Sequence, residues 1–186
     1  MPNLPAATPN PDWNRRRQAA SKYRPNRVRL LVIGASPPAD TTRWFYFEDD
    51  APADDLFEEV VRVMFEEERG TQRKEPFLRE LRRRGVFMMD LKPDAPRHGE
   101  PLAAYVAPLL LNIGPLAPEA IVLIEGDVYD AAYREMKKAG LPVVDVRVPS
   151  PSSGHEVEFR RQFRVALIRG GLEKLIRPLP AGKRDA

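Results

Sequence analysis

Residues 143–155, VVDVRVPSPSSGH, place a short apolar run directly before a turn that holds two prolines and three serines. The run Val143–Val146 has the length and composition of a buried β-strand. The prolines fix φ, while the serines offer hydroxyl donors and free backbone N–H groups. The turn is therefore either an ordinary strand-to-helix connection with a serine cap or a binding loop.

Three similar runs precede this one, at Val28–Ile33, Val86–Met89 and Ile121–Ile124. Apolar residues recur at helical spacing in the segments between and after the runs. The predicted helices lie over 56–65, 77–84 and 102–113, around 132–140, and over 159–167. Parallel strands covered on both faces appear as continuous apolar runs. The alternation predicts a three-layer α/β/α sandwich with a central, mainly parallel four-stranded sheet.

The length of 186 residues and the hydrophobic content of 42% predict one domain with tails. Residues 1–29 carry seven Lys or Arg against one acidic residue, and residues 169–186 carry five against two. The remaining body is therefore acidic. We expect a flexible, basic, proline-rich leader over 1–26, a single α/β domain over 27–169 and a basic tail over 170–186. Such ends either hold phosphate backbones or keep a protein in solution.

Composition also excludes several classes of site. The chain has no cysteine, so it can form no disulfide, iron–sulfur cluster or cysteine-ligated zinc site. Its two histidines, His98 and His155, lie far apart without the spacing of metal ligands. No apolar run approaches the roughly 20 residues of a membrane span. We expect a cytoplasmic monomer that needs no metal, cofactor or membrane.

Ligands of open α/β sheets bind beyond the carboxyl ends of the strands, so the segments that follow the strands define the candidate site. We expect these segments to meet on one rim. They are Gly34-Ala35-Ser36-Pro37-Pro38, Asp90-Leu91-Lys92-Pro93, Glu125-Gly126-Asp127 and the proline–serine turn.

The first and last of these loops resemble those of the uracil-DNA glycosylase superfamily. Its members carry a Gly-x-x-Pro loop after the first strand and a His/Asn-Pro-Ser-x-x-Ser loop after the last. These motifs map to Gly34–Pro37 and Val148–Ser153, and the order of elements fits from about Val28 to Ile168. The resemblance implies a uracil-DNA glycosylase-like fold and a protein that flips a nucleotide out of DNA, stacks its base on an aromatic ring and hydrolyses the N-glycosidic bond.

The resemblance also implies residue roles. The first loop would form the base pocket through Gly34, Ala35 and Pro37. A stacking ring would come from Trp44, Phe45 or Phe47, unless this cluster packs in the core. The turn would hold DNA phosphates, with Ser150 and Ser153 as the main contacts. Its phosphate-binding residues would be Pro149, Ser150, Pro151, Ser152, Ser153 and Gly154.

Two positions depart from the family's pattern. Ser36 stands where the family usually has a water-activating Asp or Asn, and serine is a poor base at neutral pH. Val148 replaces the His or Asn that stabilises the departing base. A catalytic group would therefore have to come from elsewhere.

Asp90 is the first candidate for that group, because it ends a buried strand where partial desolvation can tune a carboxylate. Alternatively it caps a turn or pairs with Lys92. His155 either replaces the missing electrophile or caps the last helix. Three other acids, Asp40, Glu48 and Glu125, are expected to be solvated or structural.

Three functions stay open. The first is a divergent DNA glycosylase that uses Asp90, Ser36 and His155. The second is a non-catalytic or repurposed relative that binds nucleic acid or a nucleotide-like ligand. The third is an unrelated α/β enzyme acting on a small anion, which the backbone N–H groups near Gly34 and in the turn would bind.

Overall fold

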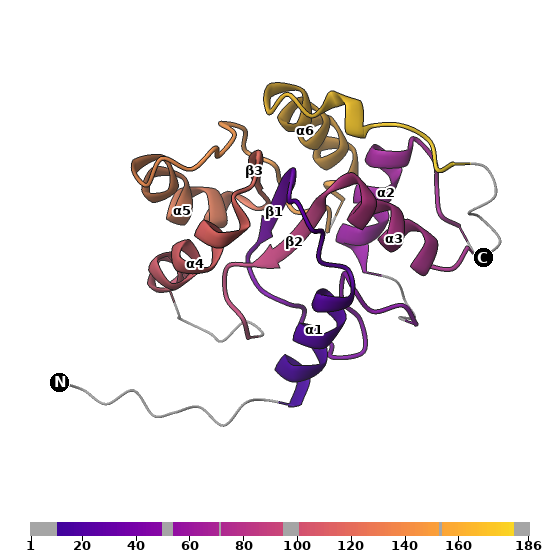
Figure 1. The fold of residues 1–186 in the computed structure, drawn as a ribbon, viewed down its shortest axis with the longest axis horizontal. Coiled ribbons are helices and arrows are strands. Elements are labelled where there is room, and N and C mark those ends of the chain that lie inside the picture. Colours follow the sequence, from indigo (N-terminus) through magenta and orange to yellow (C-terminus); the bar gives the residue numbers. More distant parts are fainter. Residues whose placement is uncertain (1–10, 50–53, 71, 95–100, 153, 181–186) are drawn as a thin grey trace.

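The protein is an α/β structure built on a parallel sheet with helices on both sides (Figure 1). The computed structural model describes residues 11–49, 54–70, 72–94, 101–152 and 154–180. Three strands, β1 (Leu30–Gly34), β2 (Val86–Asp90) and β3 (Ala120–Leu123), form the sheet in the order β2-β1-β3. Leu30 pairs with Val86 on one side and with Ala120 on the other. The predicted α/β class and parallel sheet are confirmed.

The helices form two groups, one on each side of the sheet (Figure 1). On one side α2 contacts α6, and on the other α4 contacts α5. The apolar residues predicted to face inward are buried, including Phe57, Phe77 and Phe159. The helices are α1 (Pro11–Lys22), α2 (Asp55–Phe65), α3 (Glu75–Arg84), α4 (Val106–Ile113), α5 (Gly126–Lys138) and α6 (Glu156–Arg169).

The prediction of a four-stranded sheet is wrong for the described residues. Residues 143–148 run beside β3 but pair with it only at two isolated parallel bridges, Ile121 with Val143 and Ile124 with Val148. The cause is local, because the N–H of Val143 bonds to the carbonyl of Leu141 and that of Val146 to the carbonyl of Val144. These bonds use backbone N–H groups within the segment itself, so a continuous hydrogen-bonded ladder with β3 does not form.

The predicted tails also differ from the structure. Residues 11–22 of the expected flexible leader form α1, whose Arg16 is buried, and Tyr23 after it is buried as well. At the other end Leu172, Leu175 and Leu179 are buried. The described parts of both tails therefore pack onto the body instead of extending from it. The sequence of α1 did not predict this packing, because it is mainly polar and charged and the side chain that it buries is that of an arginine, Arg16.

Gly85 ends α3 as a glycine cap, as the sequence predicted, with φ +80° and its N–H bonded to the carbonyl of Arg82. A Cβ at this position would lie 2.8 Å from the carbonyl oxygen of Arg27. Gly140 also has positive φ, +73°, but a Cβ there would meet nothing within 4 Å. A substitution at Gly140 therefore tests backbone strain alone, whereas one at Gly85 tests backbone strain together with a steric clash.

We expect Gly140→Ala to lower the free energy of unfolding by about 1 kcal/mol, the cost of left-handed backbone alone. Gly85→Ala should lower it by about a further 1–3 kcal/mol, because the added methyl group must displace backbone. Urea unfolding of both variants measures this. Equal losses in the two variants would contradict the clash at Gly85.

Candidate functional site at the carboxyl edge of the sheet

A cavity of about 320 Å³ opens at the carboxyl edge of the sheet. Because β1 lies between β2 and β3, the chain continues from this edge in opposite directions along the sheet. Open α/β sheets bind ligands at the point where this change of direction occurs. Segments after each strand line the cavity, so the predicted convergence is observed. The lining comes from residues 34–38, 43–45, 54–56, 88, 90, 124–125 and 150–152.

Asp90 is the titratable group best placed for chemistry. Its Oδ2 accepts a hydrogen bond from Nε1 of Trp44 at 3.2 Å. Burial raises the pKa of Asp90 to about 7; the charge of Asp54 adds to the rise, while the Trp44 hydrogen bond and the charge of Arg16 oppose it. A carboxyl with this pKa exchanges protons readily at neutral pH, as a general acid or base must.

Gly34 leaves room for that carboxylate. A Cβ on Gly34 would lie 3.5 Å from Oδ1 of Asp90 and 3.2 Å from Cε of Met88. The carbonyl of Gly34 also accepts a hydrogen bond from the N–H of Leu91, which continues the pairing of β1 with β2 past Asp90. The glycine of the first motif thus allows the first loop to pass close to the Asp90 side chain.

The aromatic cluster divides between cavity wall and core. Trp44 and Phe45 line the cavity, although both are mostly buried. Phe47 does not line it, and instead packs edge-on against Trp44 with ring centroids 5.6 Å apart. Buried Lys74 donates a hydrogen bond to the backbone carbonyl of Trp44 at 2.8 Å, which fixes the backbone at this residue. Two of the three predicted stacking residues therefore reach the site.

Tyr46 secures the exposed edge of the sheet beside Asp90. Its hydroxyl accepts a hydrogen bond from the N–H of Met88 at 2.7 Å and donates one to the Met88 carbonyl at 3.2 Å. Edge strands carry unpaired backbone groups that must be covered. Tyr46 pairs with both backbone groups of Met88, and so fixes the strand two residues before Asp90.

Glu125 joins three segments of the rim. Its N–H donates to the carbonyl of Val148 at 2.7 Å, and its carboxylate accepts a backbone hydrogen bond from Ala35. Burial raises the pKa of Glu125, and the Ala35 bond partly offsets this. The residue has φ +80° and ψ 139°, a conformation that non-glycine residues rarely adopt. Sequence alone carries no signal of that strain.

The proline–serine turn reaches the cavity through Ser150, Pro151 and Ser152, and the two serine hydroxyl oxygens lie 3.0 Å apart. The other predicted phosphate contacts, Pro149 and Gly154, do not line the cavity. Ser153 lies outside the described residues. The turn therefore presents two hydroxyl groups to the site.

The remaining candidates other than Ser36 do not line the cavity. His155 is exposed at the start of α6 and makes no capping hydrogen bond with its side chain, and His98 lies outside the described residues. Asp40 is exposed, and hydrogen bonds from Thr42 hold its pKa below the usual range. Glu48 accepts hydrogen bonds from Lys22 and Tyr23. Ser36 does line the cavity, beside Asp90.

Sequence reasoning missed Asp54 and Arg43, which also line the cavity. Asp54 caps the start of α2 by accepting a hydrogen bond from the N–H of Phe57 at 3.0 Å. An aspartate just before an amphipathic run is a recognisable cap signal. Arg43 is the cation among the lining residues, and its Nε lies 3.6 Å from Oδ2 of Asp40.

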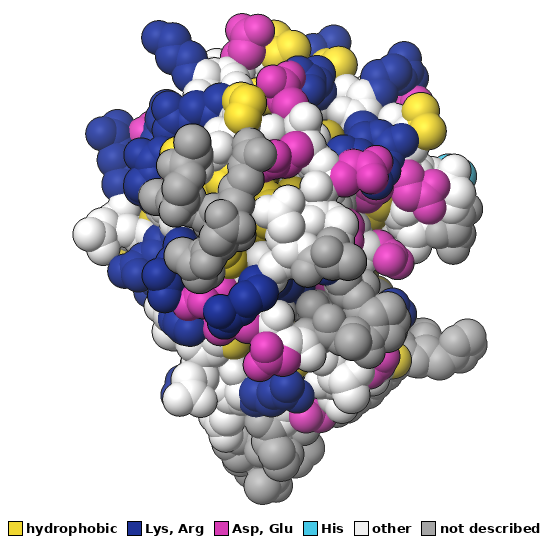
Figure 2. Space-filling model, turned by 90° about the vertical axis from the view of Figure 1, so that its right-hand side faces the viewer, with side chains coloured by type: hydrophobic (Ala, Val, Ile, Leu, Met, Phe, Trp, Pro, Cys, Tyr) yellow, Lys and Arg dark blue, Asp and Glu magenta, His cyan; other side chains and the backbone are white. Residues whose placement is uncertain are grey.

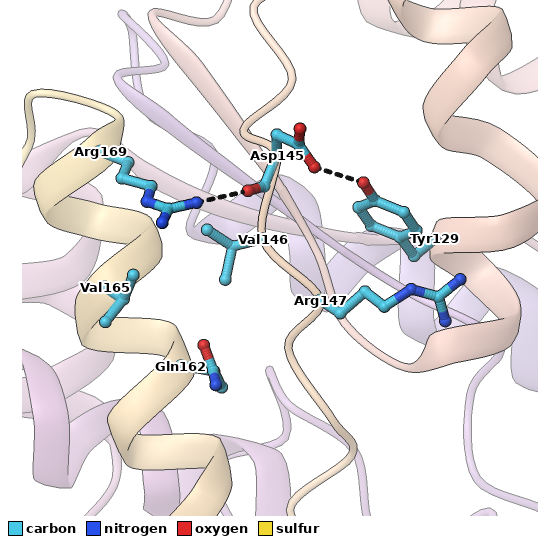
Figure 3. Close-up of a pocket in the computed structure, with 7 residues that line it drawn as sticks. All are labelled: Tyr129, Asp145, Val146, Arg147, Gln162, Val165 and Arg169. Carbon is cyan, nitrogen blue, oxygen red and sulfur yellow. Dashed lines mark hydrogen bonds between the residues drawn. The ribbon is translucent and has the colours of Figure 1, made fainter.

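Other charged groups of the described chain largely pair with each other. A second cavity, of about 410 Å³, is lined by residues of α5, α6 and the segment 145–147 (Figure 3). There the Asp145 carboxylate accepts from the hydroxyl of Tyr129, and its carbonyl accepts from Arg169 at 3.0 Å. On the face shown in Figure 2, Lys and Arg side chains gather along the left side of the view, with Asp and Glu side chains mainly in the centre and to the right.

No protein-family model matches the chain, and no curated protein matches it. Within residues 11–49, 54–70, 72–94, 101–152 and 154–180, no three histidine or acidic side chains gather as a metal site. No helix in these ranges has the length and apolar character needed to cross a membrane. Function must therefore be argued from the cavity itself.

Proposed function

We propose that the protein hydrolyses N-glycosidic bonds to a nucleobase, as a divergent relative of the uracil-DNA glycosylases. The observation that carries this proposal is Asp90, a cavity carboxyl whose pKa, raised to about 7 by burial, suits water activation. In this proposal Asp90 takes over the role of the usual first-loop Asp or Asn, a role that Ser36 at that position cannot fill as a base.

The cavity suits a flat ligand with polar edges. Its volume, about 320 Å³, lies at the lower end of the range of small-molecule sites, roughly 300–1,000 Å³. The rings of Trp44 and Phe45 supply apolar wall, while the Ser36 hydroxyl and backbone groups of the first loop supply hydrogen bonds. Ser150 and Ser152 at the mouth are the groups available to a phosphate of the nucleic-acid backbone.

In the proposed reaction, ionised Asp90 accepts a proton from a water molecule while the water oxygen bonds to the anomeric carbon of the sugar. The C–N bond breaks, and its electron pair leaves with the base, which takes a proton from solvent. Arg43 is the lining cation that can stabilise the departing anion. Arg43 would thereby stabilise the departing base in place of the family's His or Asn, whose position is occupied here by Val148.

One observation favours binding without hydrolysis. Asp54, Asp55 and Glu125 also line the cavity, so carboxylates outnumber the single lining cation, Arg43. Such a lining repels phosphate groups and favours an uncharged nucleoside or base. The second candidate function is therefore a non-catalytic protein that binds a nucleobase or nucleoside.

A glycosylase assay separates the two. Labelled oligonucleotides with uracil, hypoxanthine or xanthine, single-stranded and mispaired, and the corresponding free nucleosides serve as substrates. Base release by the wild type and by Asp49→Asn, an exposed control outside the cavity, but not by Asp90→Asn, supports hydrolysis. Calorimetric binding of a free nucleoside without any release would contradict hydrolysis and support the binding function.

A further inference from the structure

A third and larger cavity, of about 780 Å³, lies between α1, β2 and α4. It is separate from the cavity at the carboxyl edge of the sheet, here called the base cavity. The two cavities share part of a wall, which includes Trp44, Met88 and Asp90. The proposed hydrolysis makes no use of this third cavity.

Most of the wall is apolar. Phe87, Met89 and Leu91 contribute from β2 and the residue after it, and Leu109 contributes from α4. Leu111, also on α4, lines the cavity with 80% of its surface exposed. A concave, mostly apolar surface is typical of a small-molecule site.

The opposite wall carries positive charge. Arg16, Arg17 and Arg24 line the cavity, and no described carboxylate forms a salt bridge with them. The Asp90 carboxyl, which also lines the cavity, is close enough for the charge of Arg16 to lower its pKa. Arg16 is only 4% exposed. It donates one long hydrogen bond, 3.5 Å, to the carbonyl of Pro38, and its buried Nε has no hydrogen-bond partner among the described residues. A buried guanidinium is unfavourable unless an anion or several acceptors compensate it.

We propose that this cavity binds a small amphipathic anion, whose carboxylate, phosphate or sulfonate group pairs with Arg16 and whose apolar body fills the space between β2 and α4. Guanidinium groups bind such anions through charge-assisted hydrogen bonds, and the Nε–H of Arg16 has no partner among the described residues. Arg17 and Arg24 add favourable charge around the site. The volume accommodates a ligand of drug-like size.

Isothermal titration calorimetry with decanoate, decanol and decyltrimethylammonium tests the proposal, because the three probes share one chain and differ in charge. Decanoate should bind at least about tenfold more tightly than decanol, and the cation more weakly still. Decanol binding as tightly as decanoate would overturn the proposal, since an apolar surface alone would then explain binding.

Two variants locate the site. Arg16→Gln should weaken decanoate at least about tenfold and leave decanol unchanged, and Leu111→Glu should weaken both by placing a carboxylate beside the apolar wall. The matched control is Val157→Glu on α6, where an apolar side chain 70% exposed lies outside the cavity. If circular dichroism shows Arg16→Gln to be unfolded, Leu111→Glu against Val157→Glu decides. Unchanged decanoate affinity in Leu111→Glu overturns the proposal.

Anion binding and base hydrolysis are tested by separate readouts, so a failed glycosylase assay does not contradict decanoate binding, and a failed titration does not contradict hydrolysis. Because the charge of Arg16 lowers the pKa of Asp90, decanoate binding is measured by calorimetry and not through base release. The two sites can therefore be tested in the same preparation of the full chain.

Discussion

Asp90→Asn should abolish base release and at the same time make the protein more stable at neutral pH. The activity should fall by about 10²–10⁴, the usual contribution of a general base. The amide can still accept the hydrogen bond from Nε1 of Trp44, which spans 3.2 Å in the wild type. Loss of activity would therefore reflect the lost proton acceptor and not a displaced indole.

The stability gain follows from the direction of the pKa shift. Burial raises the pKa of Asp90 to about 7 in the folded protein, above the value of about 3.9 in an unfolded chain. Between those values the folded state holds the extra proton, so this carboxyl makes stability fall as pH rises through the window. Asparagine stays neutral and removes that dependence.

Thermal unfolding at pH 4 and pH 8 checks this. We expect the Asp90→Asn variant to match the wild type near pH 4 and to unfold at a higher temperature at pH 8. Asp49→Asn, at an exposed position, should match the wild type at both. A lower unfolding temperature for Asp90→Asn at pH 8 would show that ionised Asp90 stabilises the fold, as in a turn cap or a pair with Lys92.

The wild-type activity should depend on the same ionisation. Because the base must be ionised, kcat/KM should rise with pH and level off above about pH 7. Rates measured from pH 5 to pH 9 on the best substrate of the panel give the midpoint. A flat profile across this range would exclude Asp90 as the base.

The candidate site was largely predictable because parallel strands bring their carboxyl ends to one edge. The first loop with Gly34 and Ser36, Asp90, and Ser150 come from three distant stretches of the sequence, yet each stretch follows or ends an apolar run. Arg43 and Asp54 were not predicted, since they lie in the long connection between β1 and α2. Nothing in local sequence says which part of such a connection folds back over the sheet.

Other features depended on tertiary contacts that leave no local pattern. The sequence of α1 contains three consecutive arginines, which favoured a solvated leader, but Arg16 is buried under the loop that follows β1. Glu125 adopts positive φ because its N–H and carboxylate bind two other segments. In both cases long-range hydrogen bonds override local preference.

The C-terminal segment gives the largest expected effect on stability, through Arg84 of α3. The side chain is fully buried and donates hydrogen bonds to the carbonyls of Met64 at 2.8 Å, Leu175 at 2.7 Å and Pro178 at 3.1 Å. Its Nε lies 3.1 Å from the carboxylate of Glu80, which is also buried. Arg84 thus ties residues 175–178 to the end of α2.

Arg84→Ala should lower the free energy of unfolding by about 3–5 kcal/mol, because it removes one donor from the buried Glu80 carboxylate and the donor of three carbonyl groups. Urea unfolding measures the loss. Arg134→Ala is the matched control, since Arg134 is an exposed arginine within α5, and it should change stability by less than about 0.5 kcal/mol. Similar losses in the two variants would contradict a structural role for the buried guanidinium.

Glu80 gives the same contact a dependence on pH. Burial opposes ionisation of Glu80, but hydrogen bonds from Arg83 and Arg84 outweigh it and lower its pKa to about 2. A depressed pKa stabilises the fold above the unfolded value of about 4.3, and this stabilisation is lost as pH falls through the folded value. Arg84→Ala removes one of these donors, so the pKa of Glu80 should rise and the variant should lose stability at higher pH than the wild type. If Glu80 kept its low pKa in the variant, measured by carboxyl NMR titration, then its other partners, Arg83 among them, would hold that charge and Arg84 would act through the three carbonyls.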